Sequence, residues 1–354
     1  MRYLYWLFLL PLSFIDSEKV HHIGILFLKK LGVKHRGKVP SKLLSTFEMP
    51  NDPKDSKKSP LAKKLMGLDF IHPIGLAGGF DKNGEALEGF AQMGFSFIEV
   101  GTVTPRAQVG NPLPRLFRDF HEKVIFNAMG FNNLGAEAVR KNILESRPFL
   151  PEYLKIGINV GKNKDTPIEE ANRDYAICLR DLYDVGDYFV LNVSSPNTAG
   201  LRGLQNFQDL SKILDSVQNT IEQREVRKPF LIKVAPEIPD DLFRELIIEV
   251  EKNYPISGWI LTNTLQRSSP YPESTQKTGG ISGAPLMDAS RHALQVARAV
   301  SKKVLISSGG ILNPDEAALR MELGADLIQL YSGLIFEGPF IVGDIYERFL
   351  RYKS

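Results

Sequence analysis

The side chains best suited to chemistry lie in one segment, YFVLNVSSPNTAGLR, which spans residues 188–202. An apolar run is followed there directly by amide and hydroxyl side chains: Asn192, Ser194, Ser195, Asn197 and Thr198. This pattern is typical of a buried strand that leaves the core and opens into a loop. Hydrogen-bonding groups crowded at the end of a strand predict a site for a small polar ligand. An ordinary turn is the alternative, and it explains this segment equally well unless the pattern recurs elsewhere.

Two lysines outside this segment also have unusual surroundings. Lys233 lies inside the apolar run FLIKVA, where an unpaired ammonium group is costly, so we expect it to face an anionic or electron-rich partner. Lys82 lies among glycines in GGFDKNG and can reach a ligand carboxylate. The alternative for each lysine is a side chain that extends along the surface into water.

Asparagines and glycines complete the set of candidate ligand-binding residues. Asparagine offers both a donor and an acceptor, which suits a planar ring rich in amide groups; the candidates are Asn127, Asn192, Asn197 and Asn263. Glycines expose backbone amides that can hold a phosphate, although structural turns explain each one singly; the candidates are Gly279, Gly280, Gly283, Gly309, Gly310 and Gly333.

Several other chemistries are disfavoured. The single cysteine, Cys178, lies among helix-forming residues and predicts a buried structural thiol in a reducing compartment. Three of the six histidines precede residue 36, and the rest show no metal-ligand spacing, so no metal is expected. Paired carboxylates are missing from the predicted strand ends, apart from Asp81 beside Lys82.

The elements that position these residues alternate between short apolar runs and helical stretches. Eight strands are predicted, at residues 74–77, 97–101, 155–160, 188–193, 230–234, 258–261, 303–306 and 326–330. Helices are predicted between them, for example at residues 209–225, 239–252, 288–300 and 314–324. This alternation over about 290 residues predicts a (β/α)₈ TIM barrel. A doubly wound open sheet is the alternative, but no GxGxxG follows the first strand.

Polar, glycine or lysine residues follow or end every predicted strand. Examples are Thr102 after the second strand, Asn159 in the third, Thr262 after the sixth, and Tyr331 and Ser332 after the eighth. Barrel enzymes keep their active sites at this carboxyl-terminal face. Eight such ends make a coincidence of turns improbable, so we expect one site at this face.

The amino-terminal segment differs from the body in charge and hydropathy. The net charge is +3, but residues 1–64 contain 13 Lys or Arg against 5 Asp or Glu, which argues for an anionic surface near this end and against a nucleic-acid groove. Residues 3–15 are apolar but too short to span a bilayer, and Pro11 interrupts them. A secretory signal is one alternative, but no small-residue cleavage site follows.

A second helix is predicted to begin at Asp16, Ser17 and Glu18. Its apolar residues at helical spacing are Val20, Ile23, Leu26, Phe27 and Leu31, and we expect them on one side of the helix. Two short apolar helices followed by Lys34, Arg36 and Lys38 predict a helical segment that lies in a membrane interface and does not cross the bilayer. The alternative is a helical pair that packs on its own domain. Residues 50–60 predict a linker. The expected domains are a helical extension at 1–40, a linker at 41–64 and the barrel at 65–354.

Eight motifs together resemble one known family. They are GLAGGFDKNGE, EVGTVTPRAQVGNPLPRLFR, NAMGFNNLG, GINVGKNKDTP, NVSSPNTAGLR, LTNT, TGGISGAPL and IQLYSGLIFEGP. From about residue 14 onward the chain resembles the dihydroorotate dehydrogenases, in their class 2, membrane-associated, quinone-reducing form. The resemblance implies an FMN-containing barrel behind a two-helix extension. It also implies oxidation of (S)-dihydroorotate to orotate, the fourth step of de novo pyrimidine (UMP) biosynthesis, with FMN passing electrons to a membrane quinone.

The resemblance also assigns roles residue by residue. Ser195 matches the class 2 base that takes a proton from carbon 5; class 1 members have cysteine there. A lone serine is a weak base, so help from water or Thr198 is expected. Positions that match FMN-binding ones are Gly78, Gly79, Phe80, Asp81, Lys82, Thr102, Asn159, Asn192, Lys233, Thr262, Gly283, Gly310, Tyr331 and Ser332. Positions that match orotate-binding ones are Lys82, Asn127, Ala128, Met129, Gly130, Phe131, Asn192, Asn197, Asn263 and Thr264.

For the second half-reaction, His21 and Arg118 match residues that line the quinone tunnel. Ala128 stands where many members have an arginine, so no contact from that arginine is carried over. The implied location is the cell membrane, peripheral and facing the cytoplasm, with dihydroorotate or orotate, quinone and the membrane surface as partners and without nucleic acid or metal.

Four alternatives differ from this interpretation. Another FMN barrel oxidoreductase would use the same motifs, and a class 1 enzyme is disfavoured by Ser195 and by the extension. A non-redox barrel that binds a phosphorylated metabolite predicts a colourless protein, whereas a flavoprotein is yellow. A membrane-surface binding module without turnover leaves the polar strand ends unexplained.

Overall fold

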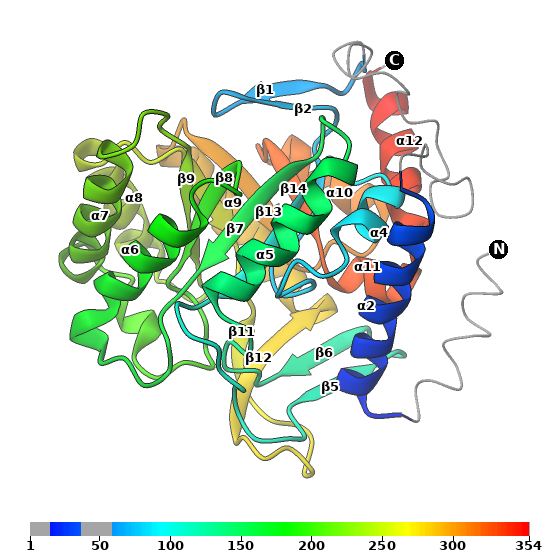
Figure 1. Ribbon diagram of the computed structural model, residues 1–354, viewed down its shortest axis with the longest axis horizontal. Coiled ribbons are helices and arrows are strands. Elements are labelled where there is room, and N and C mark those ends of the chain that lie inside the picture. Colours follow the sequence, from blue (N-terminus) through cyan, green and yellow to red (C-terminus); the bar gives the residue numbers. More distant parts are fainter. Residues whose placement is uncertain (1–14, 37–58, 354) are drawn as a thin grey trace.

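The centre of the molecule is a closed barrel of eight parallel strands (Figure 1). The computed structural model describes residues 15–36 and 59–353 of the chain. Around the barrel the strands are β3 (Ile74–Leu76), β4 (Phe97–Val103), β7 (Lys155–Val160), β8 (Tyr188–Asn192), β9 (Phe230–Val234), β10 (Gly258–Leu261), β13 (Val304–Ser308) and β14 (Leu327–Leu330). Strand β14 pairs with β3 and closes the ring. The predicted (β/α)₈ fold and all eight predicted strands are confirmed, with ends shifted by no more than two residues.

Helices cover the outside of the barrel. They are α4 (Leu87–Gln92), α5 (Ala136–Ser146), α6 (Ala171–Leu182), α7 (Phe207–Glu222), α8 (Asp240–Asn253), α9 (Met287–Val300), α10 (Pro314–Glu322), α11 (Ser332–Glu337) and α12 (Ile341–Lys353), with short 3₁₀ turns η1 (Arg147–Phe149), η2 (Ile168–Glu170), η3 (Leu201–Leu204) and η4 (Ala284–Leu286). Helix α7 shows why these segments are helical. The side chain of Asn206 accepts a hydrogen bond from the Asp209 amide at the helix start, and Leu210, Leu214 and Val217 form a buried apolar stripe.

The hydrophobic core has two parts, one outside the strands and one inside. The larger part lies between the strands and the helices and includes Ile98, Ile158 and Leu294. The smaller part fills the barrel interior with residues that include Phe97 and Tyr188. Because both faces of the strands are buried, the strands are mostly apolar and do not alternate between apolar and polar residues.

Two further sheets lie at opposite ends of the barrel, and neither was predicted (Figure 1). One is an antiparallel hairpin of β1 (Lys63–Leu65) and β2 (Leu68–Phe70), whose Phe70 joins the interior cluster. The other has the order β11 (Leu265–Ser268), β12 (Thr278–Gly283), β6 (Val124–Asn127) and β5 (Leu116–Asp119). Its strands come from loops after β4 and β10, so this sheet adds a wall at the carboxyl-terminal end of the barrel.

Helix α2 (Ser17–Lys34) packs along α4 on the outside of the barrel (Figure 1). The Asp16 carboxylate accepts hydrogen bonds from the amides of Glu18 and Lys19, which confirms the predicted helix start. The helices approach closely at two glycines: a Cβ on Gly32 would lie 2.6 Å from the Gly89 amide nitrogen, and one on Gly89 would lie 2.4 Å from the Leu28 carbonyl oxygen.

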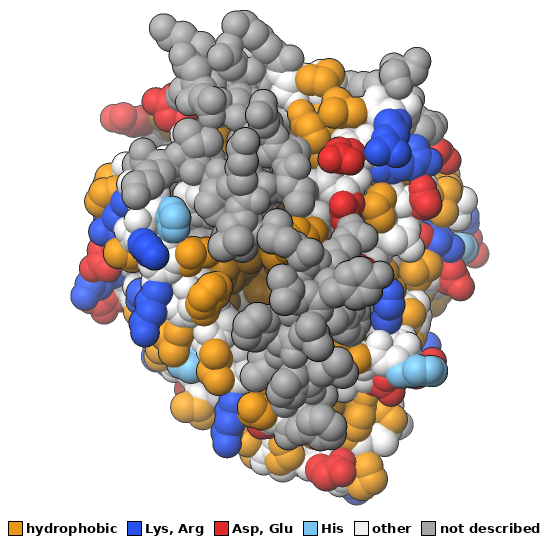
Figure 2. Space-filling model, turned by 90° about the vertical axis from the view of Figure 1, so that its right-hand side faces the viewer, with side chains coloured by type: hydrophobic (Ala, Val, Ile, Leu, Met, Phe, Trp, Pro, Cys, Tyr) orange, Lys and Arg blue, Asp and Glu red, His pale blue; other side chains and the backbone are white. Residues whose placement is uncertain are grey.

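The apolar residues of α2, which the sequence predicts on one side of the helix, differ in burial. Val20, Ile25 and Leu28 are buried and Leu31 is half-buried, whereas Ile23, Leu26 and Phe27 are exposed. Figure 2 shows the side of the molecule that carries α2, where hydrophobic side chains gather around a hollow. No helix in the described part of the chain is long and apolar enough to cross a membrane. The predicted first helix and most of the predicted linker lie outside the described residues, so the domain division stays a prediction.

Candidate active site

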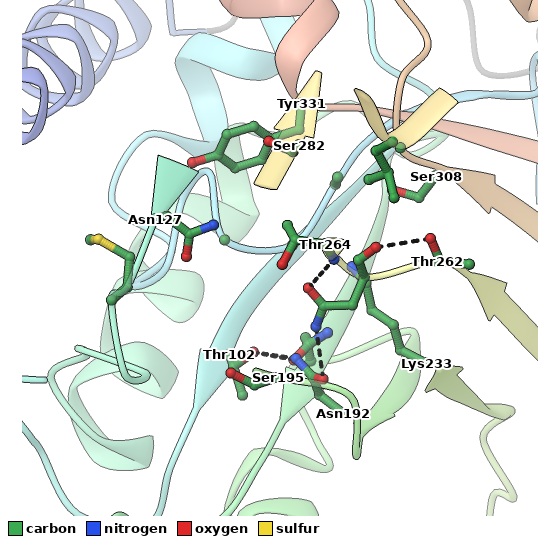
Figure 3. Close-up of a pocket in the computed structure, with 18 of the residues that line it drawn as sticks. Thr102, Asn127, Asn192, Ser195, Lys233, Thr262, Thr264, Ser282, Ser308 and Tyr331 are labelled. Atoms are coloured by element: carbon green, nitrogen blue, oxygen red, sulfur yellow. Dashed lines mark hydrogen bonds between the residues drawn. The ribbon is translucent and has the colours of Figure 1, made fainter. Parts of the chain in front are cut away.

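A cavity opens at the carboxyl-terminal ends of the barrel strands, under the wall formed by β6 and β12. Its atom-free space is about 1010 Å³, including the part open to solvent. Figure 3 shows Asn192 and Lys233 reaching toward one space, with Asn127 and Tyr331 on the other side. The site therefore lies at the face where the sequence predicted it.

Asn192, at the end of β8, organises one side of the cavity. Its Nδ2 donates to Thr102 Oγ1 (2.8 Å), and Thr102 Oγ1 donates to Asn159 Oδ1 (2.5 Å). Its Oδ1 accepts from Ser194 Oγ (2.8 Å), and Ser194 Oγ also accepts from Asn263 Nδ2 (3.0 Å). These side chains come from four different strand ends, so the network fixes their orientation toward any ligand.

Lys233 is buried in β9 and pairs with Glu99 of β4, with 3.5 Å between Nζ and Oε1. The prediction that this ammonium faces an anionic partner is confirmed. Glu99 also accepts from Asn159 Nδ2 (2.6 Å) and from Gln329 Nε2 (2.5 Å). A buried charged pair with these extra hydrogen bonds is satisfied, and its lysine still lines the cavity.

Ser195 lines the cavity from the loop after β8 and is almost fully buried. Its Oγ accepts a hydrogen bond from the Asn197 amide (3.2 Å). The Asn197 side chain donates to Asn127 Oδ1 (3.0 Å), which ties this loop to β6. Asn197 Oδ1 is buried and has no hydrogen-bond partner within the described residues, so it is an acceptor left for a ligand.

Four glycines let the backbone line the cavity closely. Gly79, Gly309 and Gly310 have positive φ angles of 95°, 103° and 72°, which side-chain-bearing residues rarely adopt. A Cβ on Gly78 would lie 2.4 Å from Glu99 Oε1, and one on Gly310 would lie 2.5 Å from Met287 Cα. Such loops present amides to a phosphate.

Lys82 is half-buried on the side of the cavity that faces α2. Burial lowers its pKa to about 8; nearby Glu18 raises it and Arg115 lowers it further. Glu18 makes a bidentate ion pair with Arg115, with 2.6 and 2.9 Å between their atoms. Helix α2 thus places a carboxylate beside a lysine of the cavity.

His21 of α2 donates from Nε2 to the Phe80 carbonyl oxygen (2.8 Å) and packs against the Phe80 ring. Burial, together with the charges of Lys82 and Arg118, lowers its pKa to about 3, so the imidazole is neutral at pH 7. His21 and Arg118 lie beside the cavity and do not line it.

Most of the predicted site residues line this single cavity. They are Gly78, Gly79, Lys82, Thr102, Asn127, Met129, Gly130, Phe131, Asn159, Asn192, Ser195, Asn197, Lys233, Thr262, Asn263, Thr264, Gly310, Tyr331 and Ser332. Besides His21 and Arg118, four residues predicted to bind the cofactor or the substrate do not line it: Phe80, Asp81, Ala128 and Gly283.

Those four residues have other contacts in the described structure. The Asp81 carboxylate accepts from the amides of Glu85 and Ala86 (2.9 and 2.8 Å), and burial raises its pKa to about 6. The Phe80 ring packs against Tyr331. Ala128 is buried behind the cavity wall. At Gly283 a Cβ would lie 1.9 Å from the Lys123 carbonyl oxygen, so this glycine allows β12 to pack against β6.

Sequence reasoning missed several residues of the site. Ser282, Leu286 and Gln329 line the cavity, and Glu99 supports it from below. Glu99 carried a usable signal, because a carboxylate inside the apolar strand FIEVGTV is as unusual as the lysine inside FLIKV. Ser282 carried none, since it reaches the site only through the unpredicted pairing of β12 with β6.

Comparisons with known proteins agree with this site. Residues 60–352 match the family model described as dihydroorotate dehydrogenase. The chain is 40% identical over 341 residues to dihydroorotate dehydrogenase (quinone) of Christiangramia forsetii, with 95% of each chain covered. It is 43% identical over 305 residues to the protein of the same name from Nostoc punctiforme, which covers 82% of this chain and 80% of that one.

A solved structure is similar over nearly the whole chain. The crystal structure of DHODH from Eimeria tenella in complex with ferulenol has a TM-score of 0.83 and 31% identity, and the match covers 96% of this chain and 92% of that one. The family model matches residues 60–352, and the two curated relatives are 40% and 43% identical to the chain. The chain is therefore an oxidoreductase that belongs to the dihydroorotate dehydrogenase family.

Proposed function

We propose that this protein oxidises (S)-dihydroorotate to orotate, with FMN as its cofactor and a membrane quinone as the electron acceptor. The observation that carries the proposal is that one cavity brings together Ser195, Lys82 and Lys233 with the amide side chains of Asn127 and Asn197. Curated relatives named dihydroorotate dehydrogenase (quinone) support the choice of substrate and acceptor. The reaction would be the fourth step of de novo UMP biosynthesis.

The residues around the cavity fit FMN. Backbone amides at Gly309 and Gly310 suit a phosphate. Thr102 and Lys233 would lie against the ring system. When bound, FMN would supply the acceptor for the hydride from carbon 6 and would carry the electrons onward.

The substrate would be held by groups on the other side of the cavity. The Lys82 ammonium would bind the carboxylate, and the side chains of Asn127, Asn197 and Asn263 would bind the ring amides. The free Asn197 Oδ1 is an acceptor for a ring N–H. Asn197 is hydrogen-bonded to Asn127, and Asn263 to Ser194 of the β8 network, so these amides are held in place and would favour one orientation of the ligand.

Ser195 would take the proton from carbon 5 of the substrate. The hydroxyl is a weak base, so the proton must pass onward, through water or through Thr198 three residues along the same loop. The Asn197 amide that donates to Ser195 Oγ would stabilise negative charge on this oxygen as the proton is taken. Burial of Ser195 keeps bulk water from competing for the proton.

The second half of the proposal concerns α2 and the membrane. His21 of α2 lies near Lys82 and Arg118, and Tyr331 of the cavity lies near Arg118 and near Glu18 of α2. The neutral His21 imidazole suits an uncharged quinone. The exposed Ile23, Leu26 and Phe27 suit insertion into a lipid interface. The protein would therefore lie on the cytoplasmic face of the cell membrane as a peripheral enzyme.

The test is the visible spectrum of the purified full-length protein. We expect a yellow protein whose flavin absorbance is bleached by dihydroorotate without oxygen and restored by a soluble quinone. A colourless protein, or a yellow protein that dihydroorotate does not bleach, would contradict the proposal. A non-redox barrel predicts the first of these outcomes, and a flavin enzyme with another substrate predicts the second.

A further inference from the structure

Glu99 is a fully buried carboxylate that the proposed reaction does not use. It lies in the middle of β4 and is 0% exposed. Its carboxylate contacts three side chains that line the cavity: Lys233 of β9, Asn159 of β7 and Gln329 of β14. One charge therefore holds donors from three strands under the cavity floor.

The backbone is also shaped around this carboxylate. A Cβ on Gly78 would lie 2.4 Å from Glu99 Oε1, so the carboxylate occupies the space that any side chain at this position would need. Gly78 lines the cavity, so the Glu99 carboxylate lies directly behind a residue of the cavity wall. Because Glu99 is shielded from water, its charge acts strongly on neighbouring groups.

We propose that Glu99 is a positioning residue that lowers the reduction potential of the bound flavin in two ways: it holds and neutralises the Lys233 ammonium, and its own negative charge lies behind the cavity wall. This inference rests on the proposed binding of FMN. Reduction adds negative charge to the cofactor, and a nearby ammonium favours the reduced form. The Glu99 carboxylate opposes this effect, and it keeps Lys233 in one place and Gln329 Oε1 turned away from itself.

The test measures the flavin midpoint potential of the full-length holoenzyme by spectroelectrochemical titration. Glu99→Gln keeps the shape of the side chain and leaves Lys233 uncompensated, so the potential is expected to become more positive. We expect at least a tenfold change in the reduction equilibrium, about 30 mV for a two-electron couple. Lys233→Met is expected to shift the potential in the opposite direction.

Asp187→Asn is the matched control. Asp187 pairs with Arg147 at 3.0 Å and precedes β8, at the end of the barrel opposite the cavity. Its loss also breaks an ion pair, but no charge next to the cavity changes. The midpoint potential of this variant is expected to equal that of the wild type.

A double variant keeps the inference testable if Glu99→Gln fails to fold. Removing both charges of a buried pair is tolerated far better than removing one. Glu99→Gln/Lys233→Met is expected to have a more positive potential than Lys233→Met alone, because the remaining carboxylate is gone.

Two results would overturn the inference: an unshifted potential in folded, yellow Glu99→Gln, or equal potentials for Lys233→Met and the double variant. Either result would leave the proposed function intact. A wild-type protein without flavin would instead refute the proposed function, so the two failures are distinguishable.

Discussion

The cavity and the seam between α2 and α4 both join parts of the chain that lie far apart in sequence, but by different interactions. In the cavity, side chains from β4, β7, β8 and β14 share hydrogen bonds around Asn192 and Glu99. In the seam, backbones approach at Gly32 and Gly89, and few apolar side chains are buried. Side-chain hydrogen bonds hold the residues of the cavity in place, whereas the seam depends on close packing of two helices.

Helix α2 is held at its two ends by bidentate pairs between arginine and glutamate. Near its start Glu18 binds Arg115, and just beyond its end Arg36 binds Glu88, at 2.9 Å for both hydrogen bonds. The Glu18 pair is the more buried of the two and lies beside the cavity. Changes in the cavity should therefore affect the chemistry, whereas changes in α2 should affect how this helix docks on the barrel, except at Glu18 where the two regions meet.

The largest effect is expected in the cavity itself. Ser195→Ala should keep the yellow colour and the spectral change caused by orotate, because the flavin and amide contacts remain. Flavin reduction by dihydroorotate should slow by about 10²-fold or more, the usual cost of losing a general base. Anaerobic stopped-flow absorbance measures this rate. Near-normal reduction would show that another group takes the proton.

The next largest effect is expected from removing the extension, residues 1–40. Quinone turnover and membrane binding should be largely lost, since the exposed apolar residues of α2 and His21 are gone. Flavin reduction by dihydroorotate should fall much less. Liposome flotation and the two half-reaction rates measure this. Equal loss of both half-reactions would show that the cavity needs the extension as much as quinone turnover does.

The barrel could be predicted from the sequence because its strands have a strong local signal. Each is a continuous apolar run that ends in polar residues or glycine, as in β8 with Asn192. The wall sheet has no such signal: β11 is exposed in three of its four residues, and β6 pairs with β12, which lies about 150 residues away. The position of Ser282 in the cavity wall could therefore not be predicted from the sequence.

The orientation of α2 could not be predicted for a different reason. Helical spacing identifies an apolar stripe but does not say whether the protein or a membrane covers it. The face that packs on α4 is defined by Gly32 and Leu28, and glycine carries no hydrophobic signal. The residues left exposed, Ile23, Leu26 and Phe27, came from the predicted stripe.

The meeting point of the two regions predicts a smaller effect. Arg115 Nη1 donates to the carbonyl oxygens of Val109 and Asn111 (2.6 Å each), and Asn111 Nδ2 donates to the Ala128 carbonyl oxygen (2.9 Å). Loss of the Glu18 carboxylate should loosen this support behind the predicted orotate-binding segment.

Glu18→Gln should therefore raise the KM for dihydroorotate about fivefold, roughly 1 kcal/mol, with a smaller effect on the maximal rate of flavin reduction. Arg36→Gln is the matched control, because it breaks the pair at the other end of α2, away from the cavity. Both variants should weaken quinone turnover. A KM that rises equally in both would mean that helix docking as a whole, and not the Glu18 pair, supports the substrate site.

The smallest effect is expected from pH. Burial lowers the pKa of Lys82 to about 8, so its ammonium is fully charged at pH 6 to 7 and half-charged near pH 8. If this ammonium binds the orotate carboxylate, orotate affinity should fall about twofold between pH 7 and pH 8 and continue to fall above that. Spectral titration of the flavin with orotate at each pH measures this affinity.

Lys82→Arg is the control for this pH dependence, because its guanidinium stays charged over the whole range. Its affinity for orotate should be flat with pH even if it is weaker. Glu18→Gln should move the midpoint to lower pH, since the carboxylate beside Lys82 favours the charged ammonium. A midpoint that stays in place in Glu18→Gln would mean that α2 supports the cavity through Arg115 alone and does not act on Lys82 by charge.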